Sequence, residues 1–197
     1  MNIIGVGGIG SPIAETLARM GFDLRIWDHD TVSPENVGSQ RYGFPDIERP
    51  KVDVLKERLE TAYQITVEAN ACKYEGQEVL EGIVVSGVDS LETRAMIWEH
   101  MKFNPAVTLF IDGRVGGTRF KVFALNPCGD LDRAEKYESR LDLTASRTEL
   151  QCTSKFAPQA GSALDWCITS LIISHIGKGT VPFAVIGEDF MLQVTQD

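Results

Sequence analysis

Short apolar stretches alternate with amphipathic ones along most of the 197 residues. Apolar runs of four or five residues predict buried strands, and apolar residues spaced three or four apart predict helices packed on a sheet. The pattern predicts strands at 2–5, 23–27, 65–69, 83–86, 108–112, 119–125 and 188–194, and helices at 11–20, 51–61, 91–103 and 160–176. Strands that alternate with helices indicate a Rossmann-like α/β fold, with a mostly parallel sheet flanked by helices and an antiparallel C-terminal extension.

One long stretch lacks this pattern. Residues 126–159 are rich in charge, contain Pro127, Gly129 and Pro158, and are predicted to be irregular. A long loop in a compact domain is usually functional or mobile, so this region is either a lid over a site or a surface excursion. We expect residues 1–197 to form a single domain, because a chain of this length can bury one sizeable core.

The first helix is preceded by a glycine-rich turn. Gly5, Gly7 and Gly10 follow an apolar strand, and the helix then begins near Ser11. Because glycines have no side chains, phosphate oxygens can reach the backbone amides, and the positive end of the helix dipole attracts these negatively charged oxygens. Asp28, at the tip of the second strand, is placed to accept hydrogen bonds from ribose hydroxyls. These features predict a nucleotide site.

The segments that follow narrow the choice of nucleotide. They are residues 28–41, residues 49–51 (Arg-Pro-Lys), residues 84–94 (Val-Val-Ser-Gly-Val-Asp-Ser-Leu-Glu-Thr-Arg) and residues 112–125. In this order they resemble the ThiF/MoeB family, the adenylyltransferases related to ubiquitin-activating enzymes, over about the whole chain.

This resemblance implies a transferase that uses ATP and Mg²⁺. A terminal carboxylate would attack the α-phosphorus of ATP and release pyrophosphate, which requires charge neutralisation and in-line positioning. The implied substrate is a small ubiquitin-like or sulfur-carrier protein, bound through its C-terminal tail. The resemblance also implies a homodimer, in which the apolar helix at 160–176, with its small residues at 161–163, packs on a second subunit.

Roles for particular residues follow from the same resemblance. Lys51 would neutralise charge on the phosphates, and Asp89 would bind magnesium through its carboxylate. Arg94 would brace the loop that carries Asp89. The residues implied to contact the nucleotide are Gly7, Gly8, Gly10, Asp28, Asn36, Gln40 and Lys51.

Each of these roles has a structural alternative. Asp89 and Ser90, with Glu92, could instead be the N-cap and first-turn acids of the following helix. Lys51 could be an exposed lysine on the helix that it begins, and Asn36 could cap a turn. His175 is interpreted as a residue of the last helical turn rather than as a catalyst.

The chain also departs from the family pattern. Ser39 stands where the family usually has an arginine, and Arg41, just beyond Gln40, is the candidate to replace its charge. The arginine that family members donate to a neighbouring subunit from helices ahead of the first strand has no counterpart here. These departures motivate a second hypothesis, a non-catalytic or partner-dependent ThiF-like binding subunit. A third, an NAD-dependent oxidoreductase, rests only on the glycines and Asp28.

The four cysteines contain no Cys-x-x-Cys pair, so no structural zinc is expected. Cys152 is the candidate for a thioester-forming nucleophile, because Lys155 lies nearby to favour its thiolate. Cys167 lies in an apolar helix and is interpreted as a core residue.

Composition limits the partners and the location. The formal charge of −9 argues against nucleic-acid binding, which needs a basic face. No apolar run is long enough to span a membrane, and the chain begins with a strand rather than a signal segment, so we expect no membrane association and a cytoplasmic protein.

Overall fold

A computed structural model describes residues 1–76, 78–116, 119–141, 157–188 and 191–195. The strands are β1 (Asn2–Ile4), β2 (Leu24–Trp27), β3 (Val67–Asn70), β4 (Gly82–Ser86), β5 (Val107–Gly116), β6 (Arg119–Leu125), β7 (Ala184–Glu188) and β8 (Met191–Thr195). The α-helices are α1 (Gly10–Arg19), α2 (Lys51–Tyr63), α3 (Leu91–Met101), α4 (Leu131–Glu138) and α5 (Ala157–Lys178). Two short 3₁₀ helices, Pro34–Asn36 and Phe44–Asp46, lie in the long loop before α2.

All eight strands form one sheet in the order β3-β2-β1-β4-β5-β6-β7-β8. The strands β1 to β5 are parallel to one another, and β6, β7 and β8 are added antiparallel. The predicted fold class is therefore confirmed. The chain moves from β1 outward to β3 and then returns to β4 on the other side of β1, so the strand order reverses between β1 and β4. In open α/β sheets, ligands bind at the carboxyl ends of the strands at such a reversal.

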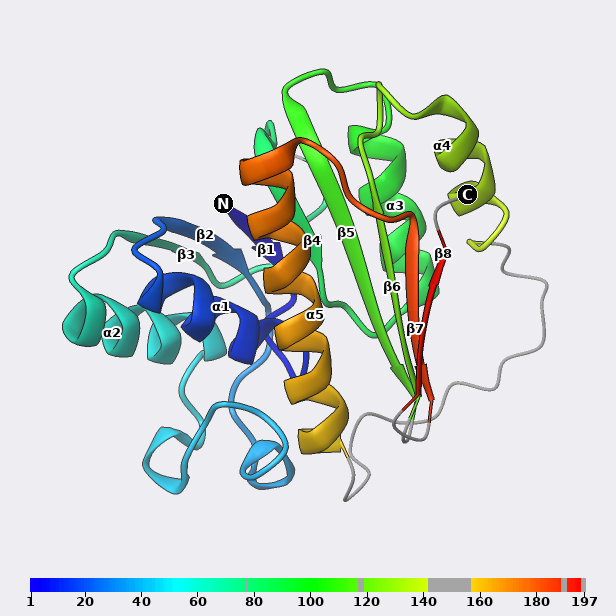
Figure 1. The fold of residues 1–197 in the computed structure, drawn as a ribbon. Helices are drawn as coiled ribbons and strands as arrows, with labels where there is room; N and C mark the ends of the chain where they lie inside the picture. Colours follow the sequence, from blue (N-terminus) through cyan, green and yellow to red (C-terminus); the bar gives the residue numbers. More distant parts are fainter. Residues whose placement is uncertain (77, 117–118, 142–156, 189–190, 196–197) are drawn as a thin grey trace.

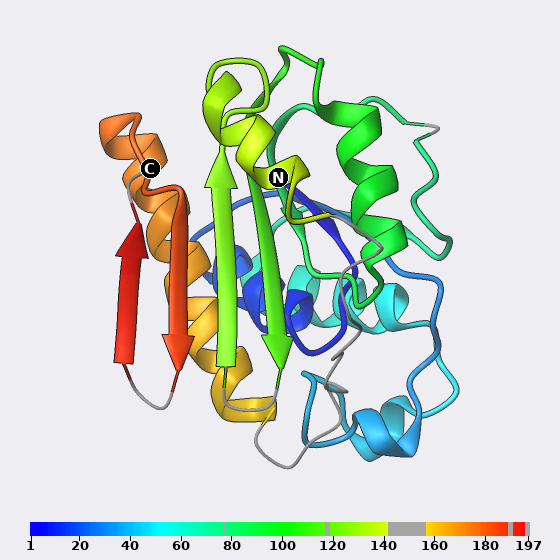
Figure 2. The same cartoon turned by 90° about the vertical axis from the view of Figure 1, so that its right-hand side faces the viewer.

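A hydrophobic core lies on each face of the sheet. Helices α1, α2 and α5 cover one face, with Ile13, Leu55 and Leu164 fully buried. Helices α3 and α4 cover the other, as the two views show (Figure 1, Figure 2). There the rings of Trp98 and Tyr137 have their centroids 5.0 Å apart. None of the described helices has the length and apolar character that a membrane span requires.

The predicted elements differ from the structure mainly in the last third of the chain. Helix α4 was predicted as part of an irregular region, because its one fully buried side chain is Tyr137 and its Leu131 is exposed. The single strand predicted at 188–194 is wrong, since β7 and β8 form a hairpin there. The predicted lid falls partly on α4 and otherwise largely on residues 142–156, which lie outside the described residues.

Candidate active site

The glycine loop joins β1 to α1 at the carboxyl edge of the sheet. Gly5 has φ +85°, and a Cβ on Gly10 would lie 1.9 Å from the carbonyl oxygen of Gly5. The fold itself therefore requires glycine at both positions. A Cβ on Gly7 or Gly8 would meet nothing closer than 3.7 Å, which is ordinary contact. Since packing does not demand glycine there, the missing side chains are best explained by close approach of a ligand to the backbone.

The amino end of α1 is available to an anion. Its N-cap residue, Ile9, provides no side-chain cap, and the first turn holds no acidic residue. Ser11 organises this end, because its Oγ donates to the carbonyl of Gly7 at 2.7 Å and accepts from the amide of Arg41 at 3.0 Å. Free amides and the positive helix dipole together form an anion-binding site.

Asp28 lies where the sequence predicted, after the last residue of β2. Its carboxylate accepts from the amide of Val6 at 2.8 Å and from the amide of Asp30 at 2.9 Å. Asp28 thus ties the glycine loop to the end of β2. A carboxylate has about four acceptor positions, so capacity for ribose hydroxyls remains.

Lys51 is not an exposed lysine, so that alternative is wrong. Its side chain is 5% exposed, and Nζ lies 2.8 Å from Oδ2 of Asp30. Burial by itself raises the pKa of Asp30, but the hydrogen bond and the charge of Lys51 outweigh it and hold that pKa below its ordinary value. The structure therefore brings a buried ammonium group to the loop that follows Asp28.

If Lys51 contacts phosphate as the sequence predicts, Lys51→Met will weaken ATP binding at least about tenfold, because it removes a charge-assisted contact while keeping an unbranched side chain. Asp30 is half exposed and can be solvated when its partner is lost, so the protein should remain folded. Isothermal titration calorimetry measures the affinity. Lys56→Met, on the exposed side of α2, is the matched control and should leave it unchanged.

The loop before α2 lies over the glycine loop. The side-chain amide of Gln40 lies 3.9 Å from the position of a Cβ on Gly7, and its Oε1 is buried with no partner among the described residues. Asn36 is also buried and accepts from the amide of Ser33 at 3.0 Å, so it does cap a turn. The structure therefore brings Gln40 to the glycine loop, whereas the Asn36 oxygen is engaged locally.

Arg41, the candidate to replace the arginine that the family usually has at position 39, is directed toward α1. Its Nε lies 3.4 Å from a carboxylate oxygen of Glu15 on α1, and its side chain is half exposed. In this structure the guanidinium is thus paired with an acid of α1.

Asp89 comes three residues after the end of β4. The segment between them lies against the glycine loop, since a Cβ on Gly87 would lie 3.1 Å from the Gly5 carbonyl oxygen. The helix cap is Ser90, whose Oγ accepts from the amide of Thr93 at 3.0 Å. The alternative reading of this segment as a helix start is therefore confirmed for Ser90, the cap, and for Glu92 in the first turn, whereas Asp89 itself is not the cap. Asp89 is exposed and makes no hydrogen bond or ion pair within the part of the chain that the structure describes. An unengaged carboxylate fits a Mg²⁺ ion that takes its other ligands from phosphate and water.

A second group could also hold a cation. Ligand atoms of Asp28, His29 and Asp30 all lie within 4.8 Å of one another. Lys51 already neutralises one of these acids, which makes the group a poorer metal site than Asp89. It sits on the side of the site expected to contact ribose.

Two residues of the site were not predicted from the sequence. Tyr42 donates its hydroxyl to the carbonyl of Val6 at 2.7 Å, and burial raises its pKa, so it stays a neutral donor. Gly161, expected at a subunit interface, is buried against the glycine loop, because its Cβ would lie 3.0 Å from the carbonyl oxygen of Gly8. Neither contact is marked by a local motif, since each joins segments far apart in sequence.

The cysteines give a mixed outcome. Cys152 lies outside the described residues, so its proposed role stays a prediction. Cys167 is buried, and burial raises its pKa to about 11, which keeps it a neutral thiol. Its interpretation as a core residue is confirmed.

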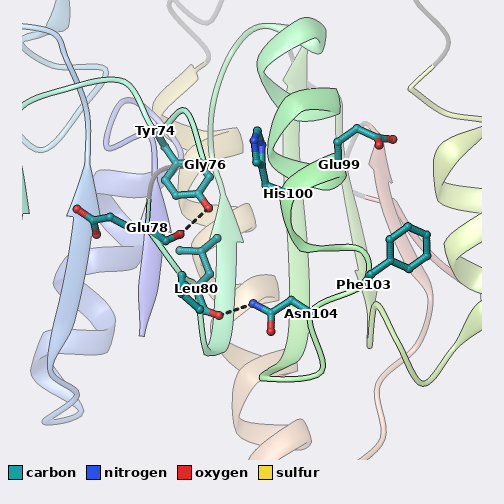
Figure 3. Close-up of a pocket in the computed structure, with 9 residues that line it drawn as sticks. Tyr74, Gly76, Glu78, Leu80, Glu99, His100, Phe103 and Asn104 are labelled. Carbon is teal, nitrogen blue, oxygen red and sulfur yellow. Dashed lines mark hydrogen bonds between the residues drawn. The ribbon is translucent and has the colours of Figure 1, made fainter.

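Two cavities of the structure lie away from the glycine loop. One, of about 350 Å³, lies between the β3–β4 connection and α3 (Figure 3). Its wall is fixed by a hydrogen bond of 3.1 Å from Tyr74 to the carbonyl of Glu78 and one of 2.7 Å from Asn104 to the carbonyl of Leu80. The other, of about 670 Å³, is lined by residues at the amino ends of β1 and β4.

Comparison with curated proteins gives two partial matches. A tRNA threonylcarbamoyladenosine dehydratase of Bacillus subtilis is 41% identical over 59 residues, which are 29% of this chain and 23% of that protein. The protein of the same name from Haemophilus influenzae is 27% identical over 125 residues, 59% of this chain and 48% of that protein. The chain thus matches less than half the length of either relative.

Solved structures share the fold. Escherichia coli MccB with ATP has a TM-score of 0.75 and 15% sequence identity, and PaaA has a TM-score of 0.70 and 17% identity. In both cases 98% of this chain and 62% of the other chain are covered. MccB with AMPCPP and MccA is similarly related, with a TM-score of 0.74 and 16% identity. The sequence profile of the ThiF family matches residues 1–154, and the chain belongs to that family.

Proposed function

We propose that this chain is an ATP-dependent adenylyltransferase that activates a carboxylate. The observation that supports this most is the glycine loop, in which Gly7 and Gly8 are open to a ligand although the fold would accept side chains there. Uncapped amides of α1 and the Gln40 amide lie at the same loop, and the buried ammonium group of Lys51 lies against Asp30, in the segment that follows Asp28. The fold match to MccB crystallised with ATP is consistent with this use of the loop.

Each of these groups would have a role in the reaction. The triphosphate would lie on the Gly7–Gly8 backbone at the end of α1, and Asp28 would accept from the ribose hydroxyls. A substrate carboxylate oxygen would attack the α-phosphorus, the bond from that phosphorus to the bridging oxygen would break, and pyrophosphate would leave with the bond's electron pair. Magnesium, when held by Asp89, supplies charge neutralisation for the phosphates. Lys51 and the helix amides would hold the same charge by hydrogen bonds.

For the substrate, we propose the C-terminal carboxylate of a small ubiquitin-like or sulfur-carrier protein. The formal charge of −9 disfavours a nucleic acid, and MccB crystallises with MccA as well as with a nucleotide analogue. A carboxylate carried by tRNA is the second candidate, because both curated relatives are named for a modified tRNA nucleoside. Magnesium-dependent exchange of pyrophosphate into ATP, stimulated by a carrier protein and not by tRNA, would separate the two.

The oligomeric state and catalytic competence are parts of the same proposal. We propose a homodimer, consistent with exposed Trp166, Ile173 and Ile176 on α5. The partner-dependent alternative gains support from Arg41, which is paired with Glu15, and from the uncharged Ser39. If a second chain supplies the missing charge, exchange will appear only when that chain is added.

Asp89→Asn separates the metal role from nucleotide binding. We expect affinity for ATP with Mg²⁺ to fall at least about tenfold, because a metal contact is lost, while affinity for ATP in EDTA stays unchanged. Calorimetry in the two buffers measures both. Asp132→Asn, in the first turn of α4, controls for the change in net charge. Equal losses in both buffers would mean that Asp89 acts on the nucleotide or the fold rather than on the metal.

A further inference from the structure

Arg114 has a buried nitrogen with no partner. Its Nε donates to Asp112 at 2.7 Å and its Nη1 donates to the carbonyl of Arg140 at 3.1 Å. Its Nη2 is buried, and no described residue accepts from it. A buried charged donor without an acceptor costs free energy, so its position calls for an anion.

The described residues around Arg114 hold its guanidinium group in place but leave part of its charge and one nitrogen without a partner. Its guanidinium carbon lies 5.0 Å from the centroid of the Phe123 ring and 5.8 Å from that of Tyr137. Asp112, the carboxylate it contacts, is 0% exposed and also accepts from Arg94 and from the hydroxyl of Tyr137. One carboxylate therefore serves two guanidinium groups, and it cannot fully neutralise Arg114.

A second cation stands across from it. Lys121 on β6 is the direct cross-strand partner of Arg114, and Lys121 is exposed. Like charges directly opposite each other in an antiparallel pair repel. An anion that reaches both side chains would reduce this repulsion and would accept a hydrogen bond from Nη2 of Arg114.

The position of this pair indicates which reactant it would meet. A Cβ on Gly113 would lie 3.2 Å from Ile9 of the glycine loop, so Arg114, its neighbour in the strand, points to the opposite face of the sheet. Arg94 joins the two regions, because it donates to the carbonyls of both Gly113 and Val88, and Val88 precedes Asp89. Arg114 is thus linked through Arg94 to the loop that carries Asp89.

We infer that Arg114, with Lys121, forms the subsite that binds the carboxylate at the end of a peptide substrate before adenylation. The inference rests on the proposed function for the identity of the anion. A guanidinium N–H forms a strong charge-assisted hydrogen bond with a carboxylate, and Nη2 is the nitrogen of Arg114 left for it. Arg114 would orient the carboxylate, and the reaction would occur beside Asp89.

Triglycine and triglycinamide are suitable probes, because they differ at the terminal carboxylate. In an NMR titration without nucleotide, we expect triglycine to shift the Nε–Hε signal of Arg114 saturably, with triglycinamide at least about tenfold weaker. Arg114→Gln should weaken triglycine binding about tenfold and Arg114→Lys less. Lys121→Gln should weaken it by a smaller factor, and Lys56→Gln, which removes a distant positive charge, should not change it. Equal binding of the two probes, or no response of the Arg114 signal, would overturn the inference.

ATP binding, measured on the same samples by calorimetry, separates this inference from the proposed function. Triglycine binding without ATP binding would leave the carboxylate subsite in place and contradict the adenylyltransferase. ATP binding without triglycine binding would contradict the subsite alone. If Arg114→Gln weakens ATP binding and leaves triglycine binding unchanged, Arg114 binds phosphate and the inference is wrong. Lys121→Gln and the wild-type titration keep the test decisive if Arg114→Gln does not fold.

Discussion

Gly10→Ala is expected to destabilise the protein by about 3 kcal/mol or more and to abolish ATP binding. The added Cβ would lie 1.9 Å from the Gly5 carbonyl oxygen and 3.2 Å from the side chain of Ile3. The close atom belongs to the backbone of the same loop and cannot rotate away, so the turn into α1 must open. Urea denaturation, followed by circular dichroism, measures the loss.

Gly8→Ala is the informative comparison. Its Cβ would meet only the carbonyl oxygen of Ser39, at 3.7 Å, so the free energy of unfolding should change by less than about 1 kcal/mol. ATP affinity should nevertheless fall, because the new methyl group occupies the space that a phosphate needs. Gly177→Ala, which has open space around it, controls for the general effect of replacing glycine. Unchanged ATP affinity in Gly8→Ala would contradict the assignment of this loop to phosphate.

Arg94→Gln is expected to destabilise the protein by roughly 3–5 kcal/mol, the usual effect of removing one partner of a buried ion pair. Asp112 is 0% exposed, and the Arg94 side chain is 6% exposed, so water cannot replace the lost charge. The variant also loses the hydrogen bonds to the carbonyls of Val88 and Gly113, so the loop with Asp89 should loosen. Denaturation in urea gives the free energy, and calorimetry gives the affinity for ATP with Mg²⁺.

The same substitution at an exposed pair provides the control. Arg25 pairs with Glu68 at 2.9 Å, and both side chains are at least a third exposed. Arg25→Gln should therefore cost no more than about 1 kcal/mol. If the two variants lose similar free energy, the buried cluster does not hold the fold as described.

Local sequence patterns were sufficient for the parallel half of the sheet. Strands β1 and β4 are largely apolar and mostly buried, β2 is apolar apart from Arg25, and α1 and α2 have a clear apolar side, so period and length predicted them. Helix α4 escaped detection because its packing depends on one ring, Tyr137, against distant aromatic residues. The hairpin of β7 and β8 escaped because Gly187, packed beneath Phe120, interrupts the apolar pattern.

The sequence predicts the part of the candidate site that lies at the ends of strands and in the loops that directly follow them. Asp28 and Gln40 lie at the glycine loop, and Lys51 contacts Asp30 just after Asp28, because strand ends and the following loops meet at one edge of the sheet. The sequence does not predict that Lys51 is buried or that the Asn36 side chain caps a turn, because both depend on the path of the long loop before α2. The contacts of Tyr42, Gly161 and Arg114 join elements far apart in sequence, and residue types alone do not mark them.

The most direct test of the account is calorimetric titration of the wild-type protein with ATP and Mg²⁺, and separately with NAD. The adenylyltransferase account predicts binding of ATP that depends on Mg²⁺ and weakens in Asp89→Asn, with no binding of NAD. Binding of NAD without ATP would contradict the account and favour an oxidoreductase. Binding of neither nucleotide would contradict it in favour of a non-catalytic subunit.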